Sequence, residues 1–368
     1  MSQTSCSKNI LLHLSLIEGI GPATIQKISS FIERIGGDWS LMYTFNGQDL
    51  HRQCQLHANV AQKVVTGLAD IQLLEQELAL IEKNNVTLIT MQDDHYSALL
   101  KHIYLPPPIL YLHGNRALLQ QKSIAVIGSR EANRYAQKVV DTVVPELVAY
   151  GYTIVSGGAI GADSMAHYAT LQSQGETIVV LGSGLLEPYP VRNKKLFETI
   201  VAQNGAILSP FPLGMRANEG TFPARNRIIA GLSQAVLVIQ AAVKSGARIT
   251  AQFALDQGRE VAVIPGDIFD PLSAGCHQLA RQGAAIVSST ADILELLGVT
   301  VEQQVQLSTI PAALTHDDPI VQACNLPQSF DQLLIATQLS PSELQERLFN
   351  LTLEGHIEQN AAGLWVIC

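Results

Sequence analysis

Charged and aromatic residues are scarce in this sequence, and long apolar runs are missing. Of its 368 residues 15% are charged and 5% aromatic, whereas 47% are hydrophobic. The longest uncharged apolar runs, such as 235–239 and 178–181, are far shorter than the roughly 20 residues that a membrane-spanning helix needs. The apolar content excludes disorder for the bulk of the chain. It is typical of an α/β protein without a membrane segment, whose parallel strands are buried on both faces.

Cysteines are few and dispersed. Five occur, at positions 6, 54, 276, 324 and 368, and no two of them form a C-x-x-C pair. This number and spacing indicate neither a disulfide framework nor a zinc knuckle. The apolar stretch 10–17 contains His13 and is followed by Glu18, with no small-residue cleavage site after it. We therefore expect a cytoplasmic protein without a metal site.

Positive charge is also in deficit, since the net charge is −9 at pH 7. The acidic excess lies at the C-terminal end, where residues 297–368 hold one basic and eight acidic side chains. Nucleic-acid phosphates require Lys and Arg for binding. The stretch 213–260 holds six basic residues against three acidic ones. A local basic site is therefore compatible with the acidic total.

The chain begins with a helical region. Apolar residues recur at helical spacing through residues 1–70, which predicts an N-terminal helical domain. The turn 18–22, Glu-Gly-Ile-Gly-Pro, resembles a helix-hairpin-helix, in which glycine amides meet a phosphate. The alternative, a turn that only packs a helical bundle, is the favoured interpretation because the segment is neutral.

Residues 71–297 alternate short β-branched runs with amphipathic stretches. The runs that predict strands are 86–90, 124–127, 153–155, 177–181, 206–209, 235–239, 261–264 and 285–287. Alternating strands and helices imply parallel pairing, right-handed crossovers and helices on both faces of the sheet. We predict an α/β, Rossmann-like domain.

The composition changes after residue 297. Residues 298–317 are rich in Gln, Thr and Ala and predict a linker. Residues 318–368 then carry two helical stretches, 330–337 and 342–353, and a short apolar run at 364–367. This order is typical of a winged helix-turn-helix. Arg347 is the only basic residue on the second helix, so we expect this winged-helix domain to contact protein rather than DNA.

Glycine-rich turns follow several of the predicted strands. Ligands of a parallel sheet bind beyond the carboxyl ends of its strands, where glycines leave amides at a helix N-terminus open to an anion. Segments 128–130, 156–163 and 244–250 all occupy such positions. Neither a G-x-G-x-x-G fingerprint nor a Walker A sequence is present. The turns predict phosphate binding and give no support to ATP hydrolysis.

Two arginines flank an asparagine at 225–227, close to Phe222. Arginines in this pattern bind a phosphate through bidentate hydrogen bonds or form a buried structural ion pair. The aromatic ring is suited to stacking on a base. Asp163 and His167 lie one helical turn apart, a spacing that more often makes a hydrogen-bonded brace than a catalytic pair. The sequence contains no cluster with metal-ligand spacing and no G-x-S-x-G elbow. We expect a binding protein and not an enzyme.

Taken in order, these motifs resemble the DprA/Smf family, the single-stranded-DNA-binding proteins of bacterial natural transformation. The matching segments are 128–130, 156–167, 222–233, 245–259 and 264–266. The chain departs from the family pattern at Ala162, Arg248, Ile264 and the turn 276–278. The resemblance implies that the N-terminal helical domain, residues 1–70, is SAM-like. It also implies a homodimer that binds single-stranded DNA, protects incoming strands and loads the RecA recombinase.

The resemblance also places Arg130 in a DNA pocket. No cofactor and no catalytic or metal-binding residue is expected. The candidate DNA-binding residues are Gly128, Ser129, Arg130, Ser156, Gly157, Gly158, Gly161, Arg216, Phe222, Arg225, Asn226, Arg227, Lys244, Ser245, Gly246 and Thr250.

The alternative is a LOG-like phosphoribohydrolase, a nucleotide-processing Rossmann variant. That class resembles P-G-G-x-G-T-x-x-E, in which the Glu acts. Here Ser156 and the pair Asp163-Ser164 stand at the corresponding turn, and no Glu follows one turn into the helix. A scaffold that only binds protein would have no need of phosphate-binding turns. Single-stranded-DNA binding is therefore the favoured function.

Overall fold

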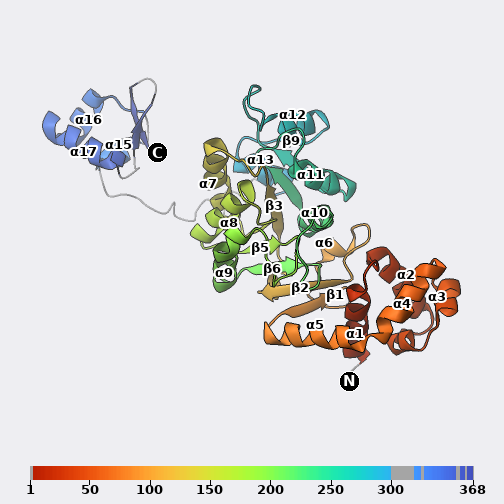
Figure 1. Ribbon diagram of the computed structural model, residues 1–368. Helices are drawn as coiled ribbons and strands as arrows, with labels where there is room; N and C mark the ends of the chain where they lie inside the picture. The colour runs from red at the N-terminus through yellow and green to blue at the C-terminus, as the bar shows by residue number, and fades with distance from the viewer. Residues whose placement is uncertain (1–2, 300–318, 325–326, 354–356, 361–362, 368) are drawn as a thin grey trace. The chain divides into compact units, whose positions relative to one another are not determined.

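The computed structural model describes residues 3–299, 319–324, 327–353, 357–360 and 363–367 (Figure 1). It divides into two compact units, residues 1–301 and 302–368. Nearly all of the predicted linker 298–317 lies outside the described residues. None of the helices in the described ranges combines the length and the apolar character needed to cross a membrane.

The first unit is built around one nine-stranded sheet, in the order β1-β2-β6-β5-β4-β3-β7-β8-β9. The strands are β1 (Thr87–Thr90), β2 (Ile109–Gly114), β3 (Ser123–Ile127), β4 (Thr153–Ser156), β5 (Thr177–Val180), β6 (Ala206–Ser209), β7 (Ala235–Val238), β8 (Glu260–Val263) and β9 (Ala285–Ile286). The pairs from β6 to β9 along the sheet are parallel. The predicted α/β, Rossmann-like class is confirmed.

The edge of the sheet that holds β1 and β2 corrects the prediction in two ways. No strand was expected at Ile109–Gly114, and β1 was expected to pair in parallel, yet β2 pairs antiparallel with both β1 and β6. Two neighbouring parallel strands are usually connected by a helix that crosses the face of the sheet. The connection from β1 to β2 contains only the four-residue α6 (Ala98–Lys101), which is too short for that role.

Helices cover both faces of the sheet (Figure 1). On one face lie α6, α10 (Thr221–Leu232), α11 (Gly246–Asp256), α12 (Ala274–Arg281) and the 3-10 helix η2 (Arg116–Gln120). The other face is covered by α7 (Arg134–Ala149), α8 (Ala162–Gln172), α13 (Thr290–Leu296) and α9 (Lys194–Ala202), which the short η3 (Val191–Asn193) precedes. The central strands β3 and β7 are therefore buried on both sides, as their apolar runs predicted.

The N-terminal helices share a core with the β2 end of the sheet. They are α1 (Gln3–Leu16), α2 (Pro22–Arg34), η1 (Trp39–Tyr43), α3 (Gly47–Gln53), α4 (Ala58–Ala69) and α5 (Ile71–Lys83). Ile109 and Tyr111 of β2 and Leu213 belong to this core. The buried carboxylate of Glu77 adds a polar contact, since its Oε1 accepts a hydrogen bond of 2.8 Å from the backbone N–H of Leu213. The helices are thus fixed to the sheet by packing, and to the segment after β6 by this bond.

Replacing Glu77 tests that polar contact. Glu77→Ala leaves the buried N–H of Leu213 without an acceptor, which costs about 1–3 kcal/mol of unfolding free energy. Glu77→Gln keeps an acceptor oxygen and should lose clearly less. Chemical denaturation of both variants measures the difference, and equal losses would show that the hydrogen bond contributes little.

The second unit is a small helical cluster with a hairpin. It contains α15 (Pro319–Ala323), α16 (Phe330–Thr337), α17 (Pro341–Leu353), β10 (Ile357–Gln359) and β11 (Trp365–Ile367). The two strands pair antiparallel, and Gln328 forms a further bridge to Trp365. Leu333, Leu344 and Leu348 lie in its core. The assignment of this unit as a winged helix stays a prediction.

Candidate functional site

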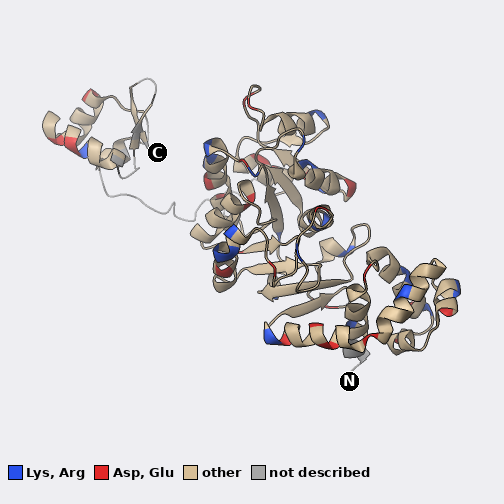
Figure 2. Ribbon diagram, in the orientation of Figure 1, with Lys and Arg blue, Asp and Glu red and all other residues tan. Residues whose placement is uncertain are grey.

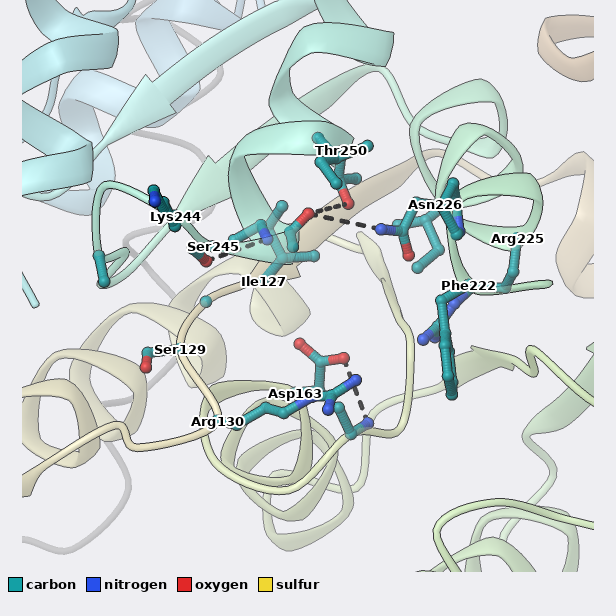
Figure 3. A pocket seen from close by; sticks show the side chains of 18 of the residues that line it. Ile127, Ser129, Arg130, Asp163, Phe222, Arg225, Asn226, Lys244, Ser245 and Thr250 are labelled. Atoms are coloured by element: carbon teal, nitrogen blue, oxygen red, sulfur yellow. Dashed lines mark hydrogen bonds between the residues drawn. The ribbon is translucent and has the colours of Figure 1, made fainter. Parts of the chain in front are cut away.

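The strand order places a ligand crevice beside β3. From β3 the chain proceeds through β4, β5 and β6 on one side and then returns to β7 on the other side of β3. Open α/β sheets bind ligands at such a reversal, beyond the carboxyl ends of the strands. A pocket of about 560 Å³ lies there, lined by residues that follow β3, β4 and β7 and by the first turns of α10 (Figure 3).

Glycines allow the turns after β3 and β4 to touch. Gly161, the residue before α8, has φ +87°, and a Cβ there would lie 2.3 Å from the carbonyl oxygen of Ser129. The same carbonyl accepts a hydrogen bond of 3.1 Å from the N–H of Ala162. A Cβ on Gly157 would lie 1.9 Å from Nη1 of Arg225. Glycine is required at Gly161 because a side chain there would separate the two turns, and at Gly157 because a side chain there would displace the Arg225 guanidinium.

Arg225 is buried under the pocket floor and holds the turns in place. Its side chain reaches from α10 to the carbonyls of Gly157 and Val180, donating from Nη1 to both, at 2.8 Å in the case of Val180. Only 5% of the residue is exposed, and Nε has no partner in the described part of the chain. Burial lowers the pKa of Arg225 to about 10, while the charge of Asp163 opposes that shift. The guanidinium remains charged at neutral pH.

Asp163 and His167 do not form the brace that their spacing suggested. Asp163 accepts a hydrogen bond from the N–H of Ala159, and burial raises its pKa although Arg225 opposes the shift. His167 instead lies 2.7 Å from the hydroxyl of Thr177, which donates to the carbonyl of Ile154. This arrangement requires Nδ1 of His167 to donate. Both residues are structural supports of the pocket wall.

Arg130 and Phe222 form the accessible part of the pocket. Arg130, at the end of the turn after β3, is exposed, and its guanidinium carbon lies 5.5 Å from the centre of the Phe222 ring. That spacing is within the range of a cation–π contact. Figure 3 shows both side chains beside the same opening. A cation and an aromatic face are thus presented together to a ligand.

The opposite wall is formed by the start of α11. Ser245 caps this helix by accepting a hydrogen bond of 3.2 Å from the N–H of Ala247, and Lys244 is exposed just before it. The side chains of Asn226 and Thr250 both donate to the carbonyl of Gly246, each at 3.4 Å. The wall is therefore ordered and carries one accessible cation.

The structure brings eleven of the predicted residues to this pocket and leaves the other five outside its lining. Those at the pocket are Gly128, Ser129, Arg130, Phe222, Arg225, Asn226, Lys244, Ser245, Gly246 and Thr250 as lining residues, with Gly157 in an adjoining hollow. The others are Ser156, Gly158, Gly161, Arg216 and Arg227.

Each of these five has another role for a physical reason. Ser156 is fully buried and donates to the carbonyl of Val126. Gly158 and Gly161 lie in the turn after β4, where a Cβ on either residue would clash with neighbouring atoms. Arg216 pairs with Glu187 at 3.7 Å. Arg227 donates to the carbonyls of Tyr104 and Leu105, on the far side of α10.

Two acidic residues of the pocket were missed by the sequence reasoning. Glu131 and Glu219 both line it and are exposed. The position of Glu131 directly after Arg130 could have revealed it, because it lies in the same strand-end turn. Nothing near Glu219 in the sequence marks it, since the turn before α10 has no recognisable pattern.

Comparison with known proteins gives the family. Residues 87–298, which include the whole pocket, match the family described as DNA recombination-mediator protein A. The chain belongs to this family, DprA/Smf. It is 39% identical to DNA processing protein DprA of Bacillus subtilis over 225 residues, which cover 61% of this chain and 75% of the relative. Over 202 residues it is 43% identical to DprA of Streptococcus pneumoniae, covering 55% of this chain and 71% of that protein.

Solved structures of the family share the fold. The X-ray structure of DprA from Streptococcus pneumoniae superposes with a TM-score of 0.69 and 34% identity, covering 78% of this chain and 97% of that one. DprA from Helicobacter pylori, whose structure describes a single-stranded DNA binding mode, gives a TM-score of 0.52 at 31% identity, covering 57% and 95%. The DprA/Smf resemblance drawn from the motifs is thereby confirmed.

The buried histidine under the pocket predicts a pH dependence of stability. Burial, with a further contribution from the charge of Arg225, lowers the pKa of His167 from 6.5 to about 3. Below pH 6.5 the unfolded chain binds this proton and the folded chain does not, so stability falls by about 1.4 kcal/mol per pH unit as the pH decreases. Denaturation of wild type and His167→Asn at pH 7.5 and 5.5 measures this, and the variant should lose less. If wild type and His167→Asn lose the same stability between these pH values, the buried His167 is not the cause of the pH dependence.

Proposed function

We propose that this pocket binds single-stranded DNA. The observation that supports the proposal best is the exposed Arg130 held over the ring of Phe222 at the mouth of the pocket. Single-strand binding proteins combine cations that contact the backbone with aromatic rings on which bases stack. A duplex hides its base faces, so the ring favours a single strand.

Three helix N-termini add a preference for an anion. α8, α10 and α11 all begin at the pocket, and neither Gly161 before α8 nor Gly220 before α10 supplies a side-chain cap. The helix dipole favours negative charge at such ends, although the first amides of α8 and α10 are already bonded, that of Ala162 to the Ser129 carbonyl and that of Thr221 to Asn218. A phosphate held there would lie close to Arg130 and Lys244. This supports Gly128, Ser129 and Gly246 as backbone contacts of the strand.

The proposal includes the wider role that the family suggests. We infer that the chain acts in the cytoplasm as a homodimer, protects incoming strands during natural transformation and helps to load the RecA recombinase. It does so without catalysing a reaction. The position of Asp163 argues against a hydrolase of the LOG type, because this carboxyl is buried and held by the Ala159 N–H and the nearby Arg225.

Replacing Arg130 tests the site. Arg130→Ala removes a phosphate contact and the partner of the Phe222 ring without disturbing the core, because the side chain is exposed. Affinity for an oligo-dT strand should fall about tenfold or more, equivalent to ~1.4 kcal/mol, with an unchanged melting temperature. Fluorescence anisotropy at two salt concentrations measures the loss.

Arg116→Ala is the matched control. Arg116 is an exposed arginine of η2 outside the lining of the pocket, and its removal changes the net charge by the same amount. We expect it to bind oligo-dT as wild type does. If both variants bind as wild type does, or if both lose the same affinity, the pocket is not the site. Tighter binding of duplex than of single strand would also contradict the proposal.

The acidic second unit should contribute little to DNA affinity. The longest helix among the described residues of this unit, α17, carries Glu343 and Glu346, and both repel phosphates. Removing residues 302–368 should leave the affinity for oligo-dT within a few fold. A well-folded truncation that loses more than about tenfold, ~1.4 kcal/mol, would show that this unit binds DNA after all.

A further inference from the structure

A second, smaller hollow adjoins the pocket on the far side of Phe222. Its lining includes Tyr189 and Pro190. Arg130, Ala159, Phe222 and Arg225 line both this hollow and the main pocket. The two hollows are therefore parts of one continuous surface, with the Phe222 ring between them.

Tyr189 extends the aromatic surface into this hollow. Its ring centre lies 5.8 Å from that of Phe222, with an angle of 55° between the planes. Tyr189 is 47% exposed, so much of its ring is open to solvent. Phe222 contacts the Arg130 guanidinium as well. Arg130, Phe222 and Tyr189 thus form a continuous series of planar groups.

The segment that carries Tyr189 is fixed to the glycine turn of the main pocket. Asn193 is buried, and its Nδ2 donates to the carbonyl of Gly158 at 2.8 Å and to Oγ of Ser164 at 2.9 Å. These two bonds join the start of α9 to the turn after β4 and to α8. Tyr189 is therefore held in position before a ligand arrives, which lowers the entropic cost of stacking on it.

Positive charge continues in the same direction. Arg192, Lys194 and Lys195 are all exposed, and Figure 2 shows the basic residues gathered at the start of α9. None of the three takes part in either ion pair found in the described part of the chain. A phosphate that leaves the hollow past Tyr189 would meet these cations.

We propose that Tyr189 and the hollow beside it form a second nucleotide subsite, in which the neighbouring base of a single strand stacks on the Tyr189 ring. Its phosphate then lies toward Arg192, Lys194 and Lys195. The inference rests on the proposed function of the main pocket. It assigns the strand a path, from the α11 wall across Phe222 to the start of α9.

Two substitutions separate stacking from the tyrosine hydroxyl. Base stacking on an aromatic ring contributes a roughly 5- to 150-fold gain in affinity per base. Tyr189→Ala in the full chain should therefore weaken oligo-dT binding at least fivefold, whereas Tyr189→Phe keeps the ring and should bind within twofold of wild type. Tyr168→Ala, which removes a similarly exposed tyrosine on α8, is the matched control and should change nothing.

A spectroscopic variant detects stacking directly. Tyr189→Trp places an indole in the hollow, and oligo-dT should quench its fluorescence, whereas an abasic oligomer of equal length should not. Tyr168→Trp should show no quenching with either ligand. Quenching reports a base in contact with residue 189 and does not depend on a loss of affinity. It therefore distinguishes a base that stacks at this position from a Tyr189 side chain that only supports the Phe222 ring.

The outcomes distinguish this inference from the proposed function. If wild type binds oligo-dT and Arg130→Ala does not, while Tyr189→Ala binds normally, the second subsite is wrong and the first stands. Absence of base-dependent quenching in a Tyr189→Trp variant that still binds oligo-dT would overturn it equally. If wild type itself fails to bind oligo-dT, both proposals fall together.

Discussion

A guanidinium shielded from solvent connects the elements from which the pocket is made. Arg225 lies on α10, and its Nη1 donates to Gly157 in the turn after β4 and to Val180 at the end of β5. Both acceptors are backbone carbonyls, so these two hydrogen bonds fix the position of the main chain and not of a side chain. The approach is possible only because Gly157 lacks a Cβ. The position of the turn after β4, and hence of the α8 N-terminus, depends on this contact.

Other arginines are also used to hold main chain. Arg227 donates to Tyr104 and Leu105, and Arg259 donates to the carbonyl of Leu99 at 2.8 Å. The cations left for a ligand at the pocket are those on its surface, Arg130 and Lys244. This division makes the proposed anion site compatible with a net charge of −9, since such a site needs few charged side chains if helix N-termini supply the rest.

The sequence predicted those parts of the fold that depend on local patterns. Apolar runs and glycine-rich turns identified β3, β4 and β7 together with the turns that line the pocket. The sequence did not predict strand β2, because Pro106, Pro107 and Pro108 directly before Ile109 are typical of a loop. It also gave the same role to Arg225 and Arg227, although residues two positions apart on a helix differ by about 200° in direction.

The remaining site residues depend on long-range contacts and carry no local signal. Tyr189 comes to Phe222 because Asn193 fixes its segment to Gly158, a pairing between positions far apart in the chain. Glu219 reaches the pocket only through the position of α10. Such residues become visible once the order of the strands is known, since that order decides which turns meet at one edge.

The proposed path of the single strand is tested most directly by crosslinking. An oligo-dT strand with photoreactive 4-thiothymidine, irradiated in complex with the full chain and mapped by mass spectrometry, reports which residues the bases touch. Crosslinks should concentrate at Phe222, at residues 128–130 and in the segment that carries Tyr189. Crosslinks confined to the N-terminal turn at 18–22 or to α17, with none at the pocket, would contradict this account of how the protein binds DNA.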